Sequence, residues 1–374
     1  MTNNISENPR EQHPDIPQFA REKRGATLKD SCVLIMGQSP LSNTYNTSGD
    51  GLPFYQGNAD FGEENPVPRS WCTEPKKITE KGDILISARA PIGTINIADE
   101  KCCIGRGVAA IRPNQEVMST AFFQHQLFAS RSKLEAMGTG STFKAIGKKT
   151  LSDFPVVTYP MNIQEAIAQQ LSLIKKQIKT ANSRLDRLDS LVKSRFVEMF
   201  GDPIENDSKL PKCKWEDVLT IVNGKNQKKV ECATGEYPIC GSGGEMGRAR
   251  QYLTKGDSVI IGRKGNINNP ILMREPFWNV DTAFGLEPNA EILIVEYFYY
   301  YCEWFDFQKL NKAVTIPSLT KADLLKIEMP LPPLALQQEF AAFVSQVDKL
   351  RFETQQQIEK LETLKKSLMQ EYFG

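Results

Sequence analysis

The segment GTGSTFKAIGKK, residues 138–149, combines glycines, hydroxyl side chains and lysines, which are residue types that can bind nucleotide phosphates. A P-loop needs a glycine, then four other residues, then Gly-Lys-Ser/Thr, so that backbone N–H groups surround the phosphates and the hydroxyl reaches magnesium. Here Thr142 occupies the glycine position and Lys149 the hydroxyl position, and Phe143 stands where a dinucleotide-binding fingerprint needs glycine. We therefore interpret the segment as a connector whose lysines can contact phosphate, and not as a nucleotide site.

Few residues support a catalytic site of another kind. The two histidines, His13 and His125, give no basis for a nucleophilic triad. Asp60, Glu74 and Lys76 loosely match the pattern of metal-dependent nucleases, but the prolines around them disfavour the strand that should carry such a site. The eight cysteines lack the spacing of a zinc site. We expect no catalytic residue and no metal ion on this chain.

Length and composition favour two domains without a strong overall charge. The chain has 374 residues, of which 40% are hydrophobic, and a net charge of +1. Any nucleic-acid binding must therefore come from local basic patches. No apolar run is long enough to span a membrane and the first residues lack a signal-peptide core, so we expect reduced cysteines and a cytoplasmic protein. Residues 1–27 are polar and interrupted by prolines, which predicts a mobile tail.

The sequence contains a long internal repeat. The segments LSDFPVVTYPMNIQEAIAQQL and LLKIEMPLPPLALQQEFAAFV align with a constant difference of 173 in residue number, which pairs Gln164 with Gln337. Upstream, KGDILISARAPIG and KGDSVIIGRKGNI align with a difference of 174, which pairs Arg89 with Arg263. A period this long indicates two copies of a whole domain and its connector.

Each copy consists of a globular part followed by a long helix. Short apolar runs opened by Gly-Asp turns predict an α+β domain over residues 28–160 and a second over 202–333. Apolar residues then recur at alternating spacings of three and four, which predicts long helices over 161–201 and 334–374.

The apolar repeat of both helices is that of a coiled coil. We expect the two helices to pair antiparallel and to relate the two domains by a pseudo-twofold axis. Near the end of the second helix, the heptad position falls on Leu364 or Lys365. The alternative is that each helix packs only on its own domain. The positions expected to pair the helices are Ile167, Leu171, Ile174, Ile178, Leu185, Leu188, Phe340, Val347, Ile358 and Leu361.

This organisation resembles the specificity subunits of type I restriction-modification enzymes. The resemblance is carried by the two aligned segments with their shared Pro-x-x-x-Gln motif, and by SRFVEMFGDP and KSLMQEYFG at the helix ends. It covers nearly the whole chain in architecture and is weakest inside the globular parts. It implies two target recognition domains that read a bipartite, asymmetric sequence in double-stranded DNA, joined by spacer helices that also dock partner subunits.

The resemblance also implies partners and cofactors. Two methyltransferase subunits and restriction (helicase–nuclease) subunits would assemble on this non-catalytic chain. S-adenosylmethionine, ATP and magnesium would be bound by those subunits and not by this one. The residues themselves leave two other classes open: an enzyme that acts on nucleic acid in its own right, as a methyltransferase or nuclease, and a coiled-coil interaction protein without a DNA role.

Basic residues in both copies are candidates for DNA contact. Lysine near phosphate gives affinity without sequence preference, whereas arginine can donate to guanine edges. Arg89 and Arg263 are favoured because both follow a strand in a loop with glycine, and we expect them to contact phosphate. Solvated surface charge is the alternative for every candidate. The full set is Lys76, Lys77, Arg89, Arg106, Lys144, Lys148, Lys149, Lys225, Lys228, Lys229, Arg248, Arg250, Arg263 and Lys264.

Overall fold

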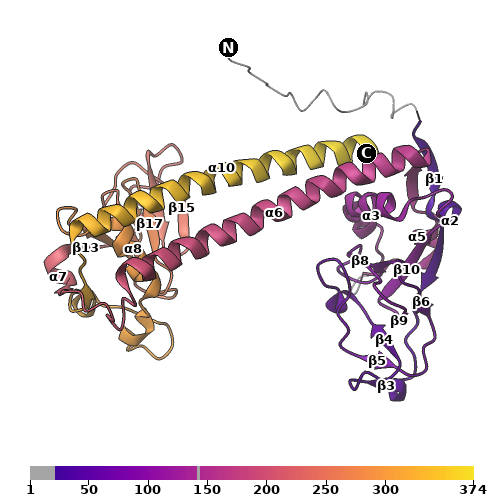
Figure 1. Ribbon diagram of the computed structural model, residues 1–374, viewed down its shortest axis with the longest axis horizontal. Coiled ribbons are helices and arrows are strands. Elements are labelled where there is room, and N and C mark those ends of the chain that lie inside the picture. Colours follow the sequence, from indigo (N-terminus) through magenta and orange to yellow (C-terminus); the bar gives the residue numbers. More distant parts are fainter. Residues whose placement is uncertain (1–21, 141–143) are drawn as a thin grey trace, which may run out of the picture. The chain divides into compact units, whose positions relative to one another are not determined.

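The computed structural model describes residues 22–140 and 144–374, which divide into two compact units (Figure 1). Unit 1 extends to Thr180 and also contains residues 358–374, whereas unit 2 is the continuous segment 181–357. Both units combine helices and strands, as the sequence predicts. None of the helices in these described ranges is both long and apolar enough to cross a membrane.

The start of the first domain differs from the sequence-based expectation. Residues 1–21 of the expected tail, including His13, lie outside the described residues. The last residues of that tail form strand β1 (Arg24–Thr27), which pairs antiparallel with β11 (Pro155–Thr158). Unit 1 therefore begins before residue 28, because β1 satisfies its backbone groups against the strand that leads into the first long helix.

Unit 1 contains two larger sheets besides the β1–β11 pair. One has the order β2-β10-β7-β8 and the other the order β3-β5-β4-β9-β6. The first consists of β2 (Cys32–Met36), β7 (Ile84–Ser87), β8 (Ile95–Ile97) and β10 (Val108–Pro113). The second consists of β3 (Tyr45–Asn46), β4 (Leu52–Tyr55), β5 (Trp71–Cys72), β6 (Ile78–Thr79) and β9 (Cys102–Ile104). The short helices are α2 (Leu28–Ser31), α3 (Thr120–Ala129), α4 (Arg131–Ala136) and α5 (Lys148–Ser152).

Unit 2 repeats this topology with a smaller third sheet. The sheet orders are β12-β20, β13-β19-β16-β17 and β15-β14-β18. The strands are β12 (Lys212–Lys214), β13 (Leu219–Asn223), β14 (Tyr237–Gly241), β15 (Gly244–Ala249), β16 (Ser258–Gly262), β17 (Ile271–Met273), β18 (Trp278–Asn279), β19 (Ala283–Pro288) and β20 (Glu328–Pro330). The short helices are α7 (Trp215–Val218), α8 (Val295–Trp304) and α9 (Lys321–Leu325).

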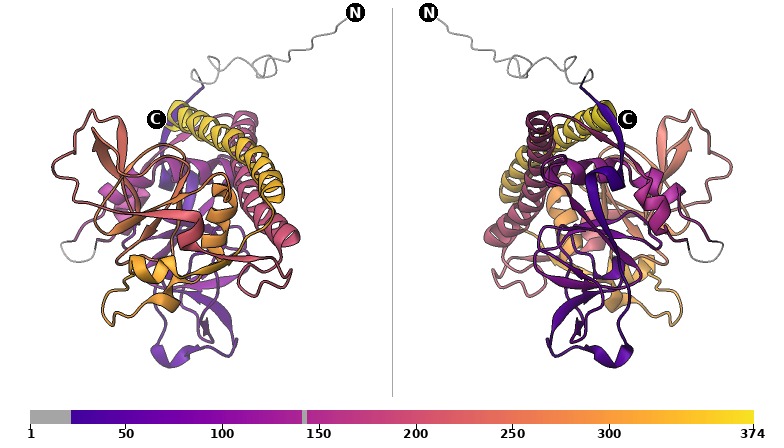
Figure 2. Two further views of the ribbon diagram at one scale, coloured as in Figure 1. Left: turned by 90° about the vertical axis from the view of Figure 1, so that its left-hand side faces the viewer. Right: turned by 90° about the vertical axis from the view of Figure 1, so that its right-hand side faces the viewer.

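Two long helices contribute to both units. Helices α6 (Met161–Phe200) and α10 (Leu334–Phe373) each have 40 residues, close to the predicted bounds. Within each unit, the two helix segments lie side by side (Figures 1 and 2). Unit 1 joins the first half of α6 to the last turns of α10, and unit 2 joins the second half of α6 to the first part of α10.

Specific contacts show that the helices pair antiparallel, as expected. In unit 1, the Tyr372 hydroxyl on α10 donates to Oε1 of Gln170 on α6 over 2.9 Å. In unit 2, Arg195 near the end of α6 forms an ion pair of 3.0 Å with Glu339 near the start of α10. Residue numbers along α6 therefore rise as those along α10 fall.

Most of the predicted pairing positions are removed from solvent. Those at most 8% exposed are Ile167, Leu171, Ile174, Leu188, Phe340, Val347 and Ile358, and those half-buried are Ile178, Leu185 and Leu361. Near the end of α10, Lys365 is half-buried while Leu364 is 46% exposed, so Lys365 continues the heptad pattern. A lysine is tolerated at this position because its long side chain can be partly buried, with its ammonium 5.0 Å from the centre of the Phe128 ring.

One strand in each unit is buried on both faces and lies between two hydrophobic cores. In unit 1, Ile84 and Ile86 of β7 face the core that α3 and the start of α6 help to form. Leu85 points to the opposite face and belongs to a second core. In unit 2, Val259 and Ile261 of β16 belong to one core, and Ile260 between them belongs to another. Alternation along these strands explains why both read as continuous apolar runs.

The strand pairings show which residues of the two copies are structurally equivalent. Ser87 at the end of β7 pairs with Val108, and Gly262 at the end of β16 pairs with Ala283. Equivalent strand residues thus differ by 175 in number, one more than the Lys-Gly-Asp turns upstream. The same offset already holds before the turn, because Thr79 pairs with Cys102 and Thr254 pairs with Phe277. Gly82 and Asp257, also 175 apart, are both left-handed, with φ of 90° and 50°. The Lys-Gly-Asp motifs that align in sequence are therefore one position out of register in the structure. The residues after β16 are therefore shifted by one position relative to the sequence alignment.

Candidate nucleic-acid interface

In unit 1, three loops meet at the end of strand β7. Ala88 donates its N–H to the carbonyl of Gly107, in the loop between β9 and β10, over 2.9 Å. Ala90 donates its N–H to the carbonyl of Lys144 over 3.1 Å, which brings in the connector. Arg89 lies between the two donors, so its exposed side chain stands at the junction of the three loops.

A fourth segment joins this junction through strand β9. The N–H of Ile104 donates to the carbonyl of Lys77 over 3.0 Å, two residues before Arg106. The backbone thus brings four cations from four segments to neighbouring positions. We call Lys77, Arg89, Arg106 and Lys144 the unit 1 rim.

The charges of the unit 1 rim are not neutralised within the unit. All four side chains are exposed, and none forms an ion pair with another residue of the described ranges. By contrast, Arg69 pairs with Asp60 and Arg112 with Asp83, both at 2.7 Å. The rim is therefore available to an external anion. The other candidates of unit 1, also exposed, are Lys76, Lys148 and Lys149.

The described part of the connector contributes to this rim through Lys144. Thr139 and Ala145 exchange two backbone hydrogen bonds of 2.9 Å, which closes the connector into a loop. Residues 141–143 lie outside the described part of the chain. They include Thr142 and Phe143, which stand where the two phosphate-binding patterns need glycine. Ile146 then returns to the core, where it is 3% exposed.

Unit 2 builds the same junction at the end of β16. Arg263 donates its N–H to the carbonyl of Thr282, in the loop between β18 and β19, over 2.7 Å. Gly265 donates its N–H to the carbonyl of Pro317 over 2.9 Å, in the segment equivalent to the connector. Lys264 lies between the two donors and is exposed.

Lys225 joins this second junction from the loop after β13. Its N–H donates to the carbonyl of Asn279 over 3.0 Å, and its carbonyl accepts the indole N–H of Trp278 over 2.9 Å. We call Lys225, Arg263 and Lys264 the unit 2 rim. No acidic side chain that the structure describes pairs with these three cations.

Isolated β-bridges identify which cations of the two rims are equivalent. Arg89 pairs with Ala145, and Lys264 pairs with Ser318. Arg263 is the residue before Lys264, and its equivalent in unit 1 is Ala88. The expected equivalence of Arg89 and Arg263 is therefore wrong by one residue, because the Lys-Gly-Asp motifs that align the two copies in sequence are one position out of register in the structure. Both units nevertheless keep an exposed cation at the bridge.

The remaining candidates of unit 2 form a separate group. Lys228 and Lys229 lie in a turn whose end accepts the N–H of Arg250 over 3.1 Å. Arg248 forms an ion pair of 3.0 Å with Glu245, so its charge is partly neutralised within the unit. Lys228, Lys229 and Arg250 therefore remain candidates for DNA contact, and Arg248 is a weaker one.

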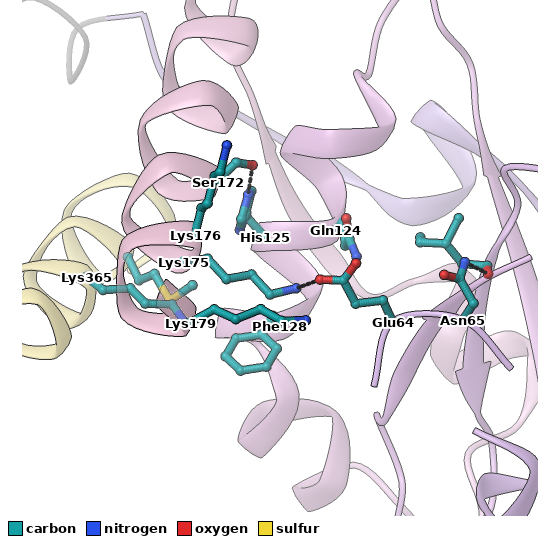
Figure 3. Close-up of a pocket in the computed structure, with 12 residues that line it drawn as sticks. Glu64, Asn65, Gln124, His125, Phe128, Ser172, Lys175, Lys176, Lys179 and Lys365 are labelled. Carbon is teal, nitrogen blue, oxygen red and sulfur yellow. Dashed lines mark hydrogen bonds and ion pairs between the residues drawn. The ribbon is translucent and has the colours of Figure 1, made fainter. Parts of the chain in front are cut away.

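Unit 1 also contains a basic pocket of about 650 Å³ that α3, α6 and α10 help to form (Figure 3). Lys175 and Lys179 of α6 extend toward the loop before β5, where they pair with Glu64 and Glu63 respectively, each at 2.9 Å. These ion pairs join the globular part of unit 1 to its long helix. The sequence analysis missed this pocket, and the only signal was the helical spacing of its lysines.

The inner wall of this pocket holds an uncharged histidine (Figure 3). Nε2 of His125 lies 2.9 Å from the hydroxyl of Ser172. Burial, aided by the charges of Lys175 and Lys365, lowers the pKa of His125 to about 4. Lys365 lies with its ammonium 5.0 Å from the centre of the Phe128 ring, and burial lowers its pKa as well. The pocket therefore concentrates positive charge around a neutral imidazole.

The residues that loosely suggested a nuclease have structural roles or stand apart. Asp60 is 8% exposed, accepts the N–H of Gln56 over 2.7 Å and pairs with Arg69. Glu74 and Lys76 are exposed. Within residues 22–140 and 144–374, no group of three or more His, Cys, Asp or Glu side chains is placed to hold a metal ion.

Comparison with known proteins agrees with this organisation. The family described as "Type I restriction modification DNA specificity domain" matches residues 24–190 and again residues 209–363. A putative type I restriction enzyme MjaX specificity subunit of Methanocaldococcus jannaschii is 41% identical over 160 residues, which are 43% of this chain and 38% of that protein. The type I restriction enzyme MjaIX specificity subunit of the same organism is 22% identical over 95% of this chain and 93% of its own length.

A solved structure shows the same fold. The S subunit of a type I restriction-modification system from M. genitalium superposes with a TM-score of 0.64 at 18% identity, covering 94% of this chain and 96% of that one. The two family matches together span most of the chain. The chain therefore belongs to the family of type I restriction-modification DNA specificity domains, of which it carries two copies.

Proposed function

We propose that this chain is the DNA-specificity subunit of a type I restriction-modification enzyme, in which each unit reads one half of a bipartite, asymmetric target in double-stranded DNA. The observation that carries the proposal is the rim, which is built twice from equivalent loops but with different side chains. Shared construction gives both units a way to hold DNA, and different side chains allow each to prefer a different sequence.

Local charge, and not overall charge, supplies the attraction to DNA. The net charge of the chain is only +1, but the rims present cations that have no acidic partner within the described residues. Such cations can replace the counterions of DNA phosphates, which makes binding depend steeply on salt. Arg89 and Lys264 occupy equivalent positions in both units and are therefore assigned to phosphate, because a shared cation carries no information about sequence.

The long helices are proposed to dock two methyltransferase subunits, on which restriction subunits assemble. Both helices keep large apolar side chains in solvent, such as Leu173 and Leu191 on α6, which are 56% and 49% exposed. These two residues are 18 positions apart, about five helical turns, and so share one face of α6. Phe352 on α10 is 63% exposed. Exposed apolar faces of this kind favour burial against a partner.

We assign the catalytic chemistry to the partner subunits. S-adenosylmethionine, ATP and magnesium would be bound there, and this chain would act in the cytoplasm without a catalytic residue of its own. The two specificity subunits of Methanocaldococcus jannaschii that resemble this chain carry names for the same role.

The proposal is tested by DNA selection and titration. The full chain, assembled with its methyltransferase subunits, is used to select duplexes from a random library, and the selected sites are then titrated at several salt concentrations. We expect a bipartite consensus and a steep loss of affinity with salt. A flat salt dependence without any consensus would support the coiled-coil interaction protein instead. Methyl transfer or DNA cleavage by the purified chain alone would support the enzyme.

A further inference from the structure

The loop between β9 and β10 in unit 1 and the loop between β18 and β19 in unit 2 carry opposite charges at one equivalent position. In unit 1, Gly107 accepts the N–H of Ala88, and Arg106 is the residue before it. In unit 2, Thr282 accepts the N–H of Arg263, and Asp281 is the residue before it. The hydrogen bonds at the end of the central strand therefore place Arg106 and Asp281 at the same point of the two rims.

We propose that these two residues determine the sequence preference of the two units. Arg106 donates hydrogen bonds to a guanine edge in one half-site, and Asp281 accepts a hydrogen bond from the exocyclic amino group of cytosine or adenine in the other. This inference rests on the proposed function and names the residues that distinguish the two half-sites.

Both side chains are free to meet a ligand. Arg106 and Asp281 are exposed, and only the backbone N–H of Arg106 is held, by the hydroxyl of Ser39 at 3.4 Å. Neither side chain forms an ion pair with any residue for which the structure gives a position. The backbone fixes where each residue lies, while the charged group is left for a partner outside the chain.

Asp281 does not serve as the counterion of its basic neighbour. Nη1 of Arg263 lies 3.4 Å from the backbone carbonyl of Asp281 and not from its carboxylate. The same guanidinium lies 5.8 Å from the centre of the Phe284 ring, a cation–π contact. The role of Asp281 in the fold is therefore supplied by its backbone, and its carboxylate is available for recognition.

An unpaired carboxylate on a surface that meets phosphates is unfavourable unless it finds a hydrogen-bond donor. In the major groove the donors on base edges are N4 of cytosine and N6 of adenine, whereas guanine offers the two acceptors that match arginine. Arg89 and Lys264 form equivalent isolated β-bridges in the two units. Both are cations, as contact with phosphate requires. The adjacent loop changes from a donor to an acceptor, as recognition of two different sequences requires.

The test compares Asp281→Ala, Asp281→Asn, Arg106→Ala and Lys264→Ala in the full chain, assembled as for the wild type, by selection from a random duplex library. We expect Arg106→Ala to lose the preference for guanine at one position of one half-site, by roughly 5- to 150-fold, with the other half-site unchanged. Asp281→Ala should lose a preference for cytosine or adenine in the other half-site by a similar factor. Asp281→Asn should prefer adenine there, because the amide pairs with both N6 and N7.

The outcomes separate this inference from the function on which it rests. If the wild-type assembly selects no bipartite site, the proposed function fails. If it does, but Asp281→Ala binds all duplexes more tightly with an unchanged consensus, Asp281 only repels phosphate and this inference is overturned. Lys264→Ala is the control, since loss of a phosphate contact should weaken all sequences alike. A melting temperature equal to that of the wild type shows that each variant is folded.

Discussion

Gln164 and Gln337 make the same three hydrogen bonds in the two units. Each side chain is fully buried at the start of a long helix, where its oxygen accepts one backbone N–H and its nitrogen donates to two carbonyls over 2.7 to 3.1 Å. The partners are Ser119, Val117 and Tyr159 for Gln164, and Ile294, Ile292 and Pro332 for Gln337. The glutamine of the repeated Pro-x-x-x-Gln motif thus joins each long helix to the start of the helix α3 or α8 that precedes it.

Replacing either glutamine with alanine should destabilise its own unit. Gln164→Ala or Gln337→Ala leaves buried backbone groups without partners, which we expect to cost about 3 kcal/mol of unfolding free energy. Hydrogen exchange should show faster opening at α3 in the first variant and at α8 in the second. The matched controls are Gln169→Ala and Gln338→Ala, whose side chains are exposed and whose loss should cost less than about 0.5 kcal/mol. If the variants of the buried glutamines were as stable as the control variants, the hydrogen bonds of Gln164 and Gln337 would contribute nothing to stability.

A carboxylate in the helix interface should separate the helices in unit 2. Leu188 is 8% exposed, and Leu188→Asp should cost several kcal/mol because it buries an unpaired charge. Leu185 is half-buried, so Leu185→Asp should have a smaller effect. Thermal unfolding and assembly with the methyltransferase subunit provide the measurements. Leu191→Asp, at a position 49% exposed, is the control for stability. Unchanged melting of Leu188→Asp would show that burial of Leu188 does not hold the two helices together in unit 2.

The length of the helices should set the spacer between the half-sites. The boundary between units crosses α6 after Thr180 and α10 after Gln357, so a heptad must be added at both points to keep the pairing in register. Seven residues lengthen each helix by about 10 Å, which corresponds to roughly three base pairs. Selected sites should keep both half-sites and gain that spacer. A heptad added after Ala181 alone should disturb pairing. An unchanged spacer in the double insertion would mean that the helices do not measure the distance.

The two equivalent cations should act on phosphate. Arg89→Ala and Lys264→Ala should each weaken binding to all sequences in a similar way and reduce the slope of log affinity against log salt by about one. Lys101→Ala is the comparison, because Lys101 is already within 3.6 Å of Glu80. A loss confined to one base pair would reassign the affected residue to base recognition.

Acid should destabilise unit 1 through His125. The pKa of this imidazole is about 4 in the folded chain, below its ordinary value of 6.5, so the unfolded chain binds the proton more readily. Stability is therefore unaffected above pH 6.5 and falls as the pH drops from there to about 4, by up to roughly 3 kcal/mol. Denaturant unfolding at pH 7.5 and pH 5 measures this. His125→Gln should lose less stability between these pH values than the wild type, and an identical loss would exclude His125 as the cause.

Local sequence signals were sufficient for the long helices. The heptad spacing and the prolines before it predicted helices that end near Gly201 and Gly374, and the structure ends them one residue earlier. The glutamine motif and the α+β class also followed from the repeat. Such features depend on residues close together in the chain, so their pattern is visible without coordinates.

The details of the rims depended on backbone geometry that the sequence does not reveal. The repeated Lys-Gly-Asp motif aligns Gly82 with Gly256, yet the backbone places Asp257 at the left-handed position of Gly82, and the same shift makes Lys264 the equivalent of Arg89. Asp281 is acidic, and the sequence signals for DNA contact are basic residues, so its position on the rim became visible only in the structure. Lys365 was one of two candidates for the helix interface, and only its burial in the structure distinguished it from Leu364, which is exposed.

The division of the long helices between units has a consequence for the order of folding during synthesis. Unit 2 is continuous, so all of its core residues have been made once residue 357 is added. Unit 1 needs residues 358–374 as well, and Tyr159 reaches the carbonyl of Tyr372, 213 positions later, over 2.9 Å. At ribosomal rates of roughly 5 to 20 residues per second, the first globular part waits on the order of 10 to 40 s after Thr180 for its last helical turns. The unit that is begun second is therefore the first that can be completed, and the apolar face of early α6 stays uncovered until then.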